Sequence, residues 1–571
     1  MVRAISSGSN SEWNSHARIE GRGHLDQELA EYASTHAGGS HNLQQQLKQG
    51  LFTRNPRLFE TAAYAFFVAI FLWLCLSTQG GEPAFALTSN IRSSLGAFEL
   101  VKDESDWFAF MMTIFPSVVV PSLYYNDNQL EEEHLGHVSG DFLLLGAIAA
   151  RQVRVKNMTC DLDDSDLIFP SVHNCFGDYS KKNEDRQQFG PQSDDLAGSL
   201  SNARKFKYST ARDLGCKVGC STVGWLKTYQ GGGFKEDLPS VRNTNTTSDL
   251  ISKITQLKAD RWLDRQTRAV FVEFTIYSVP SKLIAVVQLW YETNAQGTTR
   301  SYIQVLPMKI GHLKFSQTSL LDMLAEFFML FMTMVYTVYA CYAMYRDGPR
   351  AYFGKTWNCM DVINYMVFYL AFAFRYAAVF NGADISFPPI ETEFVYMSAV
   401  ANQILYYKYA MGFNSILTFA RIFKLLGHIP FMARLVNILS GCIEDVVSFL
   451  FCAMVVFCGY MGAFHLTYGN HLKDWATYGE CLMSLYRVTH GEWDYDGMVM
   501  YQPTIGIFYF VTFSLLSICI LMNMFVAIIM EAYDAVREEE EKVSVMEFLK
   551  SRLGRGDVAV VVETSGGEEG G

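Results

Sequence analysis

The stretch IGIFYFVTFSLLSICILMNMFVAIIM, residues 505–530, decides the fold, because no charged residue interrupts it. About twenty apolar residues in a helix cross the roughly 30 Å hydrocarbon core of a bilayer. Five other segments meet this criterion, at about 58–77, 319–344, 359–380, 395–426 and 444–467. The segment 395–426 is the weakest, since it contains Lys408, Asn414, Arg421 and Lys424. The sequence therefore predicts an α-helical membrane protein with six transmembrane helices.

Composition supports this class. The chain has 571 residues, of which 50% are hydrophobic and only 18% charged, whereas soluble domains contain about 25% charged residues. The net charge of -12 argues against a nucleic-acid partner, which requires a basic surface. We therefore expect a multi-pass integral membrane protein in contact with lipid, with residues 1–54 as a mobile cytosolic N-terminus.

One further apolar stretch, WFAFMMTIFPSVVVPSLYY at 107–125, is not counted as a span. Pro116 and Pro121 are each expected to break a helix there, since proline lacks the N–H group and clashes with the preceding turn.

The distribution of basic residues predicts the orientation. Cytoplasmic loops carry an excess of Lys and Arg, and such residues precede the first span and follow the second and fourth: Lys48, Arg54, Arg57, Arg346, Arg350, Lys355 and Arg434. Residues 79–318 then face the outside or a lumen. Asn157-Met158-Thr159 and Asn245-Thr246-Thr247 are glycosylation sequons within this region, and we predict that Asn157 and Asn245 are modified.

Residues 79–318 are numerous enough for a domain with its own core. AVFVEFTIYSV (269–279) and KLIAVVQLWYE (282–292) alternate apolar and polar residues, which is typical of strands, so we expect an α+β or mostly β domain. Disulfides are permitted in this compartment. A Cys160–Cys175 pair would close a short loop and contribute about 3 kcal/mol. Cys216 and Cys220 form a second possible pair, and free buried thiols remain the alternative for these cysteines.

Several motifs resemble the polycystin-2-like channels of the transient receptor potential superfamily. They are LLLGAIAARQVRVKN (143–157), HNCFGDYSKKNEDRQQFGP (173–191), WLKTYQGGGFKEDL (225–238), DRWLDRQTRAVFVEFTIYSVPSKLIAVVQL (260–289), KTWNCMDV (355–362) and LMNMFVAIIMEAYDAV (521–536). The resemblance covers about residues 55–540. It implies a homotetramer, or a heterotetramer with another polycystin, in a plasma, ciliary or endoplasmic reticulum membrane.

The resemblance also assigns the parts of the chain. The first helix (55–78) and helices two to four (319–427) would form a voltage-sensor-like domain, and residues 79–318 a polycystin domain outside the membrane. A linker (428–443) leads to a pore domain (444–532), and a charged helix begins the cytosolic tail (533–571).

Between the fifth and sixth spans, WATYGECLMSLYRVTHGEWDYD (475–496) is too short to cross a membrane and suits a re-entrant pore helix with a filter. A ring of Glu492 carboxylates in a tetramer would attract cations. By resemblance, His490-Gly491-Glu492 is the selectivity filter, and the carbonyl groups of His490 and Gly491 would coordinate ions. Asp494 and Asp496 would line the outer pore mouth, with a solvated acidic loop as the alternative. The family usually has leucine at His490; histidine titrates near pH ~6.5, so we expect outer acid to reduce the current.

The gate is expected at the cytosolic end of the sixth span. Counting from the filter, Val526 and Met530 occupy the positions of the family's constriction, and apolar rings can close a pore by dewetting. Simple helix packing is the alternative for these two residues.

Ionisable residues inside spans suggest function. Glu326, Asn358 and Asp361 resemble the superfamily's cytosolic-side Ca²⁺ site, and oxygen ligands suit Ca²⁺; a salt bridge to Arg421 or Lys424 is the alternative. Arg421 and Lys424 are voltage-sensor-like charges, and two such charges predict only weak voltage dependence.

These features predict a tetrameric, non-selective cation channel that is permeable to Ca²⁺, with Ca²⁺ as permeant or regulatory ion and no other cofactor. A mucolipin-type organellar channel and a receptor-like membrane protein without conduction are the alternatives. A secondary transporter is disfavoured because no internal repeat is found. No nucleophile–base or nucleotide-binding motif suggests an enzyme.

Overall fold

The computed structural model describes residues 56–553 except 125, 161–173, 193–203, 241–244, 313–317, 427–437 and 439–440. The chain divides into two compact units, Met1–Phe419 and Ala420–Gly571. Segment 1–54 with Lys48 and Arg54, most of the expected linker 428–443 with Arg434, and the tail beyond Leu553 lie outside the described residues.

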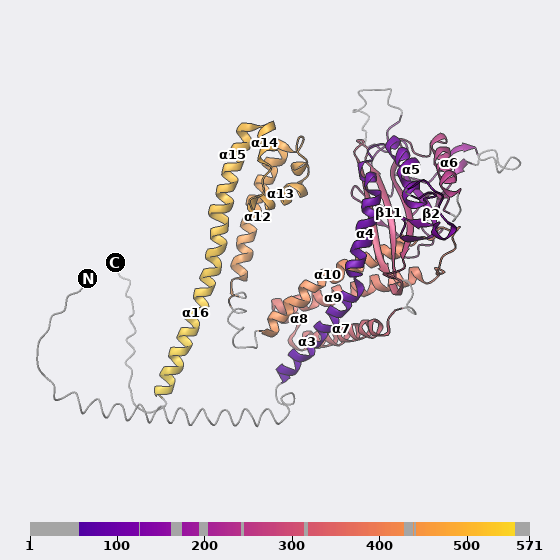
Figure 1. Ribbon diagram of the computed structural model, residues 1–571. Helices are drawn as coiled ribbons and strands as arrows, with labels where there is room; N and C mark the ends of the chain where they lie inside the picture. The colour runs from indigo at the N-terminus through magenta and orange to yellow at the C-terminus, as the bar shows by residue number, and fades with distance from the viewer. Residues whose placement is uncertain are drawn as a thin grey trace, which may run out of the picture. The chain divides into compact units, whose positions relative to one another are not determined.

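An eight-stranded antiparallel sheet forms the centre of the domain between the first two spans (Figure 1). Its main path is β12-β11-β10-β2-β9-β6, and β1 and β3 pair with β2. The strands are β1 (His137–Val138), β2 (Phe142–Val155), β3 (Glu184–Asp185), β6 (Tyr208–Ser209), β9 (Gly233–Leu238), β10 (Thr267–Ser278), β11 (Leu283–Thr293) and β12 (Thr299–Lys309). Two small hairpin pairs are β4 (Phe189–Gln192) with β5 (Arg204–Phe206), and β7 (Thr222–Val223) with β8 (Thr228–Tyr229). The two stretches expected to be strands are β10 and β11, which confirms that prediction.

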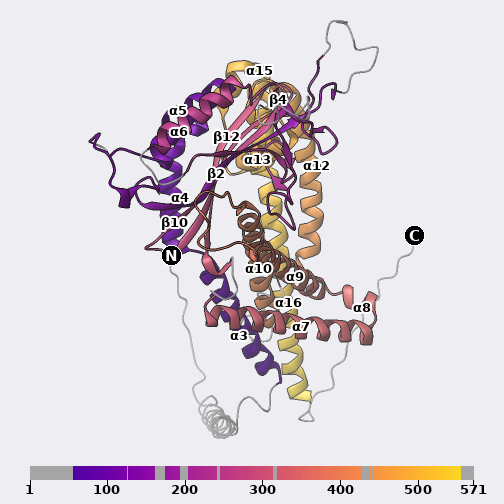
Figure 2. The ribbon, with the colours of Figure 1, turned by 90° about the vertical axis from the view of Figure 1, so that its right-hand side faces the viewer.

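Three helices share a core with one face of this sheet. They are α4 (Gly81–Leu95), α5 (Glu104–Val119) and α6 (Thr246–Ala259), and the 3₁₀ turn η1 (Gly96–Leu100) contributes Phe98 to the same core. A second 3₁₀ turn, η2 (Glu132–His134), precedes β1. Along β10, Val270, Val272 and Phe274 point into this core, because successive strand residues point to opposite faces. The domain is therefore of the α+β type, and α5 and α6 lie side by side in Figure 2.

The segment containing Pro116 corrects one expectation. Pro116 lies inside α5, which continues to Val119 and ends before Pro121. The prediction that Pro116 breaks a helix is wrong, because α5 is held by burial of Trp107, Phe115 and neighbouring side chains in the domain core, which compensates for the missing hydrogen bond. The decision not to count this segment as a span agrees with that burial.

Both expected disulfides are present. Cys160 is bonded to Cys175 and Cys216 to Cys220, with Cα atoms 5.8 and 5.9 Å apart. The alternative of free thiols at these positions is therefore wrong.

Unit Met1–Phe419 also contains long helices at the expected spans. These are α3 (Pro56–Thr78), α7 (Leu320–Asp347), α9 (Thr356–Gly382) and most of α10 (Ser398–Leu426), with a short α8 (Pro349–Phe353) between α7 and α9. In the described chain, five helical stretches are long and apolar enough to span a membrane: Thr61–Leu100, Leu320–Asp347, Thr356–Gly382, Ile443–Tyr468 and Thr504–Glu538. Helix α10 is not among the five, in keeping with its polar interruptions.

The second face of the sheet packs on α9 and α10. Ile284 and Val286 of β11 share a buried cluster with Ala378 of α9 and with Val400 and Ile404 of α10. We call the domain of residues 79–318 the outer domain, after its expected side of the membrane. This contact fixes it on the helices of its own unit.

Unit Ala420–Gly571 contains two long helical stretches joined by a compact turn region (Figure 1). Its elements are α12 (Ile443–Tyr468), η6 (Lys473–Trp475), α13 (Tyr478–Thr489), α14 (Tyr495–Tyr501), α15 (Pro503–Ser514), the π-helix η7 (Leu515–Leu521) and α16 (Met522–Leu553). The charged helix expected at the start of the tail is present as the second half of α16.

Candidate functional site

Helix α13 lies where the sequence predicts a re-entrant pore helix. Thr477 caps its start: Thr477 Oγ1 accepts the Glu480 N–H at 3.2 Å and satisfies an otherwise unpaired backbone donor. At 12 residues the helix is about 18 Å long at ~1.5 Å per residue, which is too short to cross a bilayer.

One face of α13 is buried and fixes the helix. Cys481, Leu485 and Val488 pack in a cluster with Phe464 and Tyr468 of α12. Two side chains also tie α13 to the preceding turn η6: Ser484 Oγ donates to the Asp474 carbonyl at 3.0 Å, and Cys481 Sγ donates to the Trp475 carbonyl at 3.2 Å. The opposite face exposes large apolar side chains at Leu482, Met483 and Tyr486. Such a face suits contact with lipid or with another subunit.

The expected filter His490-Gly491-Glu492 is the C-terminal cap of α13. Gly491 has φ +88°, its N–H donates to the Val488 carbonyl at 3.0 Å, and the Glu492 N–H donates to the Arg487 carbonyl at 3.1 Å. This is a Schellman motif with glycine in the left-handed position that side chains disfavour. No backbone donor of the described residues bonds to the carbonyl oxygens of His490 or Gly491.

The chain after this cap is anchored by an aromatic side chain. The Trp493 ring packs 4.7 Å from Phe510 and 6.2 Å from Phe513 on α15. The side chains of His490 and Glu492 on either side of Gly491 are exposed. The Schellman cap and Trp493 therefore hold an exposed carboxylate between two fixed points.

The two expected outer-mouth carboxylates differ in role. Asp494 caps α14, since its Oδ1 accepts the Gly497 N–H at 3.1 Å, so a local structural reason accounts for this residue. Asp496 is exposed on the first turn of α14. Of the two, only Asp496 presents its carboxylate without such a cap role.

Val526 and Met530, the expected gate residues, lie on α16 with exposed fractions of 54% and 52%. Phe525 beside them packs toward α12, with its ring 6.1 Å from Phe449. At about 100° per residue, Val526 and Met530 are turned away from that contact. The seven-residue π-helix Leu515–Leu521 precedes them; sequence analysis missed it, and such insertions often occur at functional sites.

The structure does not bring the expected Ca²⁺ ligands together. Glu326 lies near the start of α7 and accepts a hydrogen bond from Arg375, near the end of α9. Asp361 lies near the start of α9, about 21 Å from Arg375 along that helix at ~1.5 Å per residue. Asn358 Nδ2 donates to the Tyr352 carbonyl at 3.0 Å. The grouping of Glu326 with Asn358 and Asp361 is therefore wrong, and among the described residues no cluster of three or more His, Cys, Asp or Glu could hold a metal ion.

Arg375 is a buried charged side chain that sequence analysis missed. Its Nε donates to Glu326 Oε1 at 3.0 Å, and its Nη1 donates to the His312 carbonyl at 3.2 Å. Glu326 thus pairs with Arg375, whereas a salt bridge of Asp361 to Arg421 or Lys424 stays a prediction. The available signal was a lone arginine inside the apolar run of the third span. His312, in the 3₁₀ turn η4 (Ile310–His312), has a pKa well below its usual value because of burial and the nearby Arg375.

Arg421 and Lys424 are half-buried near the end of α10. A neutral network precedes them on this helix: Asn364 Nδ2 of α9 donates to Asn414 Oδ1 and to Thr418 Oγ1, both at 3.0 Å. Tyr64 of α3 donates to the Thr418 carbonyl at 2.8 Å. This network joins three helices by polar contacts inside an apolar bundle.

Both sequon asparagines are exposed in the outer domain. Asn157 Nδ2 donates to Asn174 Oδ1 at 2.5 Å beside the Cys160–Cys175 bond, and Asn245 immediately precedes α6. Glycosylation at these residues stays a prediction.

Long apolar helices, a short helix with an exposed acidic turn between two of them, and an α+β domain inserted after the first helix define a multi-pass membrane protein of the channel type. The chain belongs to the polycystin channel family. The polycystin domain model matches residues 97–311, and the polycystin cation channel model matches residues 314–536.

Relatives agree with this assignment. Polycystin-2 of Danio rerio is 26% identical over 82% of this chain and 50% of that protein. Polycystin-2-like protein 2 of Homo sapiens is 24% identical over 90% of this chain and 80% of that protein. The polycystin family receptor for egg jelly of Mus musculus is 24% identical over 72% of this chain and 20% of that protein. The chain thus spans half the length of the polycystin-2 that it matches.

Proposed function

We propose that the protein is a cation channel in which Glu492 supplies the charge of the selectivity filter. The observation that carries this proposal is the cap of α13, which holds Glu492 exposed directly after a short buried helix between two long apolar helices. Four copies around one axis would form a carboxylate ring that attracts cations and repels anions.

The carbonyl groups of His490 and Gly491 would coordinate partly dehydrated ions beside this ring. The absence of backbone donors to these carbonyls among the described residues supports that role. A narrow apolar constriction at Val526 and Met530 would close the pore. Permeability to Ca²⁺, a tetramer of one or of several polycystins, and a plasma, ciliary or endoplasmic reticulum location complete the proposal, with family membership as support.

The test is single-channel recording of the purified full chain in planar bilayers. Glu492→Gln should strongly reduce the preference for cations over anions and the unitary conductance. Asp496→Asn removes an equal charge four residues away, and its effect should be smaller. Equal effects of the two substitutions would contradict the assignment of Glu492 to the filter.

A receptor-like protein without conduction is the second candidate, and its support is the likeness to the receptor for egg jelly. Absence of current from correctly assembled, purified protein under all ionic conditions would favour it. The polycystin family models support the polycystin reading over the mucolipin-type alternative.

A further inference from the structure

The β7–β8 hairpin of the outer domain is fastened by one buried carboxylate. Glu292, near the end of β11, is 0% exposed. Its Oε2 accepts the N–H groups of Trp225 and Leu226, both at 3.0 Å. Both backbone hydrogen bonds at the tip of the hairpin therefore end on this single oxygen atom.

The fit at this point is close. A Cβ atom at Gly224 would lie 1.8 Å from Glu292 Oε1, so no side chain can stand there while the carboxylate is in place. The Trp225 side chain is 69% exposed, so the hairpin lies on the domain surface. The base of the hairpin is buried, with Tyr229 of β8 packed on Phe271 and Trp290, so the movement considered below is confined to the turn at residues 224–227.

The same segment is attached to the long helices of its unit. Asn402 Nδ2 of α10 donates to Thr222 Oγ1 at 3.4 Å, and Gln403 Nε2 donates to the Gly219 carbonyl at 3.3 Å. Asn381 of α9 binds the backbone of the disulfide-closed loop, with its Oδ1 accepting the Val218 N–H at 3.1 Å. We call residues 216–230 the strap, because it joins β11 to α9 and α10.

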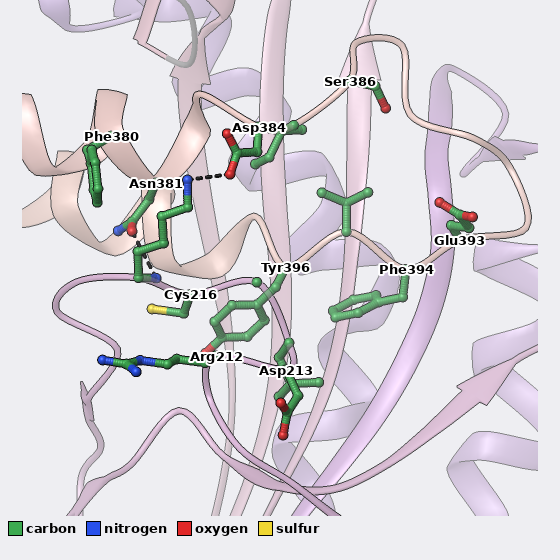
Figure 3. Close-up of a pocket in the computed structure, with 15 residues that line it drawn as sticks. Arg212, Asp213, Cys216, Phe380, Asn381, Asp384, Ser386, Glu393, Phe394 and Tyr396 are labelled. Atoms are coloured by element: carbon green, nitrogen blue, oxygen red, sulfur yellow. Dashed lines mark hydrogen bonds and ion pairs between the residues drawn. The ribbon is translucent and has the colours of Figure 1, made fainter.

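Figure 3 shows the helix end of the strap. Asn381 reaches the backbone at Lys217, and the Lys217 side chain forms an ion pair with Asp384. A cavity of about 690 Å³ lies between this loop and the segment that connects α9 with α10. The strap thus contacts the helices through these polar bonds and through a small apolar cluster, in which Cys216 packs with Tyr396 and with Ala399 of α10.

The pKa of the Glu292 carboxyl group is higher than that of an ordinary glutamate. Burial raises its pKa to about 7, although the two backbone hydrogen bonds oppose the shift. The ionisable groups around it are Tyr229 of the hairpin, Tyr302 and Arg300 of β12, Tyr179, and the ion pair of Lys227 with Asp178. Burial also raises the pKa of the three tyrosines, so they stay neutral near pH 7.

We propose that Glu292 is a proton-binding site whose occupancy holds the strap closed and so couples the pH of the outer solution to α9 and α10. In the closed state the carboxyl group is buried and favours the neutral form. When the turn at residues 224–227 lifts, water reaches the group and it ionises like an ordinary glutamate. By linkage, proton binding stabilises the closed state, and the strap opens more often as the pH rises.

The size of the pH effect on strap opening follows from the pKa of Glu292 in the closed and in the open state. With a pKa of about 7 when closed and the ordinary value of 4.5 when open, the opening equilibrium increases about tenfold between pH 6 and pH 8.

Hydrogen–deuterium exchange of the full chain in lipid nanodiscs tests the proposal without requiring conduction. After correction for the intrinsic exchange rate, protection of the Trp225 and Leu226 amides should fall about tenfold from pH 6 to pH 8. Amides of the β2–β9 ladder, such as that of Phe234, should not change. Equal pH dependence at both places, or none at the hairpin, would overturn the proposal.

Two variants sharpen the test. Glu292→Gln removes ionisation, so hairpin protection should become independent of pH. Glu133→Gln, an exposed carboxylate of the same domain, should behave like the parent. If Glu292→Gln does not fold, Gly224→Ala should expel the carboxylate and abolish the pH dependence with low protection at every pH. A tenfold change that persists in either variant would refute the role of Glu292.

A second measurement depends on the proposed channel function. Current between outer pH 6 and 8 should vary in the parent and lose part of that variation in Glu292→Gln, while Glu492→Gln should leave the exchange result unchanged. If no variant conducts, the channel proposal fails and the exchange data still decide the strap. If the current is unaffected by Glu292→Gln, the coupling to α9 and α10 is wrong.

Discussion

Arg375 and Glu326 form a buried ion pair between α9 and α7, with Nε and Oε1 3.0 Å apart and exposed side-chain fractions of 1% and 10%. The guanidinium group also donates to the carbonyls of His312 and Gly311, so one side chain joins two helices and the end of the outer domain. A buried charge without its partner is costly. We therefore interpret Glu326 as a structural counter-ion rather than a Ca²⁺ ligand.

Removing one partner of this pair should destabilise the protein. We expect Glu326→Gln to lower the free energy of unfolding by about 3 kcal/mol or more, because Arg375 is left buried with an uncompensated charge. Thermal unfolding of the full chain in detergent measures the effect. Asp347→Asn is the matched control, since its ion pair with Arg346 is exposed and exposed ion pairs contribute little to stability. Equal losses in the two variants would contradict this account.

The cap of α13 predicts a specific glycine effect. Gly491 has φ +88° and open space around its Cβ position, so Gly491→Ala should cost about 1 kcal/mol through the backbone alone and should alter unitary conductance. Gly479→Ala also meets no neighbour, but it lies in the first turn of α13, where alanine is favoured. Its stability should be equal to or higher than that of the parent. Stability measurements and single-channel recordings of the two variants separate backbone strain from added volume.

The sequence predicts the apolar helices well, because the hydrophobic requirement of a span depends only on local composition. The ends of α3, α7, α9 and α12 fall within a few residues of the expected ones. Strands β10 and β11 could be predicted equally well, because the alternation of apolar and polar residues along a strand is also a local pattern.

The errors concern long-range contacts and changes of helical register. The partner of Glu326 is 49 residues away, and no spacing rule connects the two. Pro116 is accommodated inside α5 because burial of the helix in the domain core outweighs the local tendency of proline to break a helix. The π-helix at 515–521 could not be predicted, because nearly every residue of this run is apolar. Without alternation of polar and apolar residues, the sequence does not show a change of helical register.

The expected gate can be tested with two neighbouring residues of α16. Val526→Asn should hydrate the constriction and increase the current that remains in the closed state. Met524→Asn is the matched control, because Met524 has a similar exposed fraction of 50% and lies about 200° around the helix from Val526. Planar-bilayer recording at closing voltages measures the leak. A leak that is equal in the two variants, or absent from Val526→Asn, would show that Val526 does not form the gate.

The two disulfides should differ in their contribution to stability. Their sequence separations are 15 and 4 residues, and the chain-entropy model assigns about 3 and about 2 kcal/mol to loops of these lengths. Cys160→Ser should therefore lower the unfolding temperature more than Cys220→Ser. Thermal unfolding with and without reductant measures both, and reductant should bring all three proteins to a similar, lower value. A larger loss of unfolding temperature in Cys220→Ser than in Cys160→Ser would contradict this prediction. It would indicate that the contacts of the strap, which contains the Cys216–Cys220 bond, contribute more to stability than loop entropy does.

The stability of the outer domain should depend on pH through Glu292. Its pKa is about 7 in the folded protein and near 4.5 when hydrated, so between these values the folded state binds more protons than the unfolded state. The free energy of unfolding contributed by this group therefore falls as the pH rises from 4.5 to 7 and is level above 7. The change is at most about 3.4 kcal/mol. The free energy of unfolding should be measured against pH for the parent and for Glu292→Gln. The two curves should diverge between pH 7 and pH 4.5 and run parallel above pH 7. The curve of Glu133→Gln should follow that of the parent. Parallel curves throughout would show that Glu292 ionises normally in the folded protein.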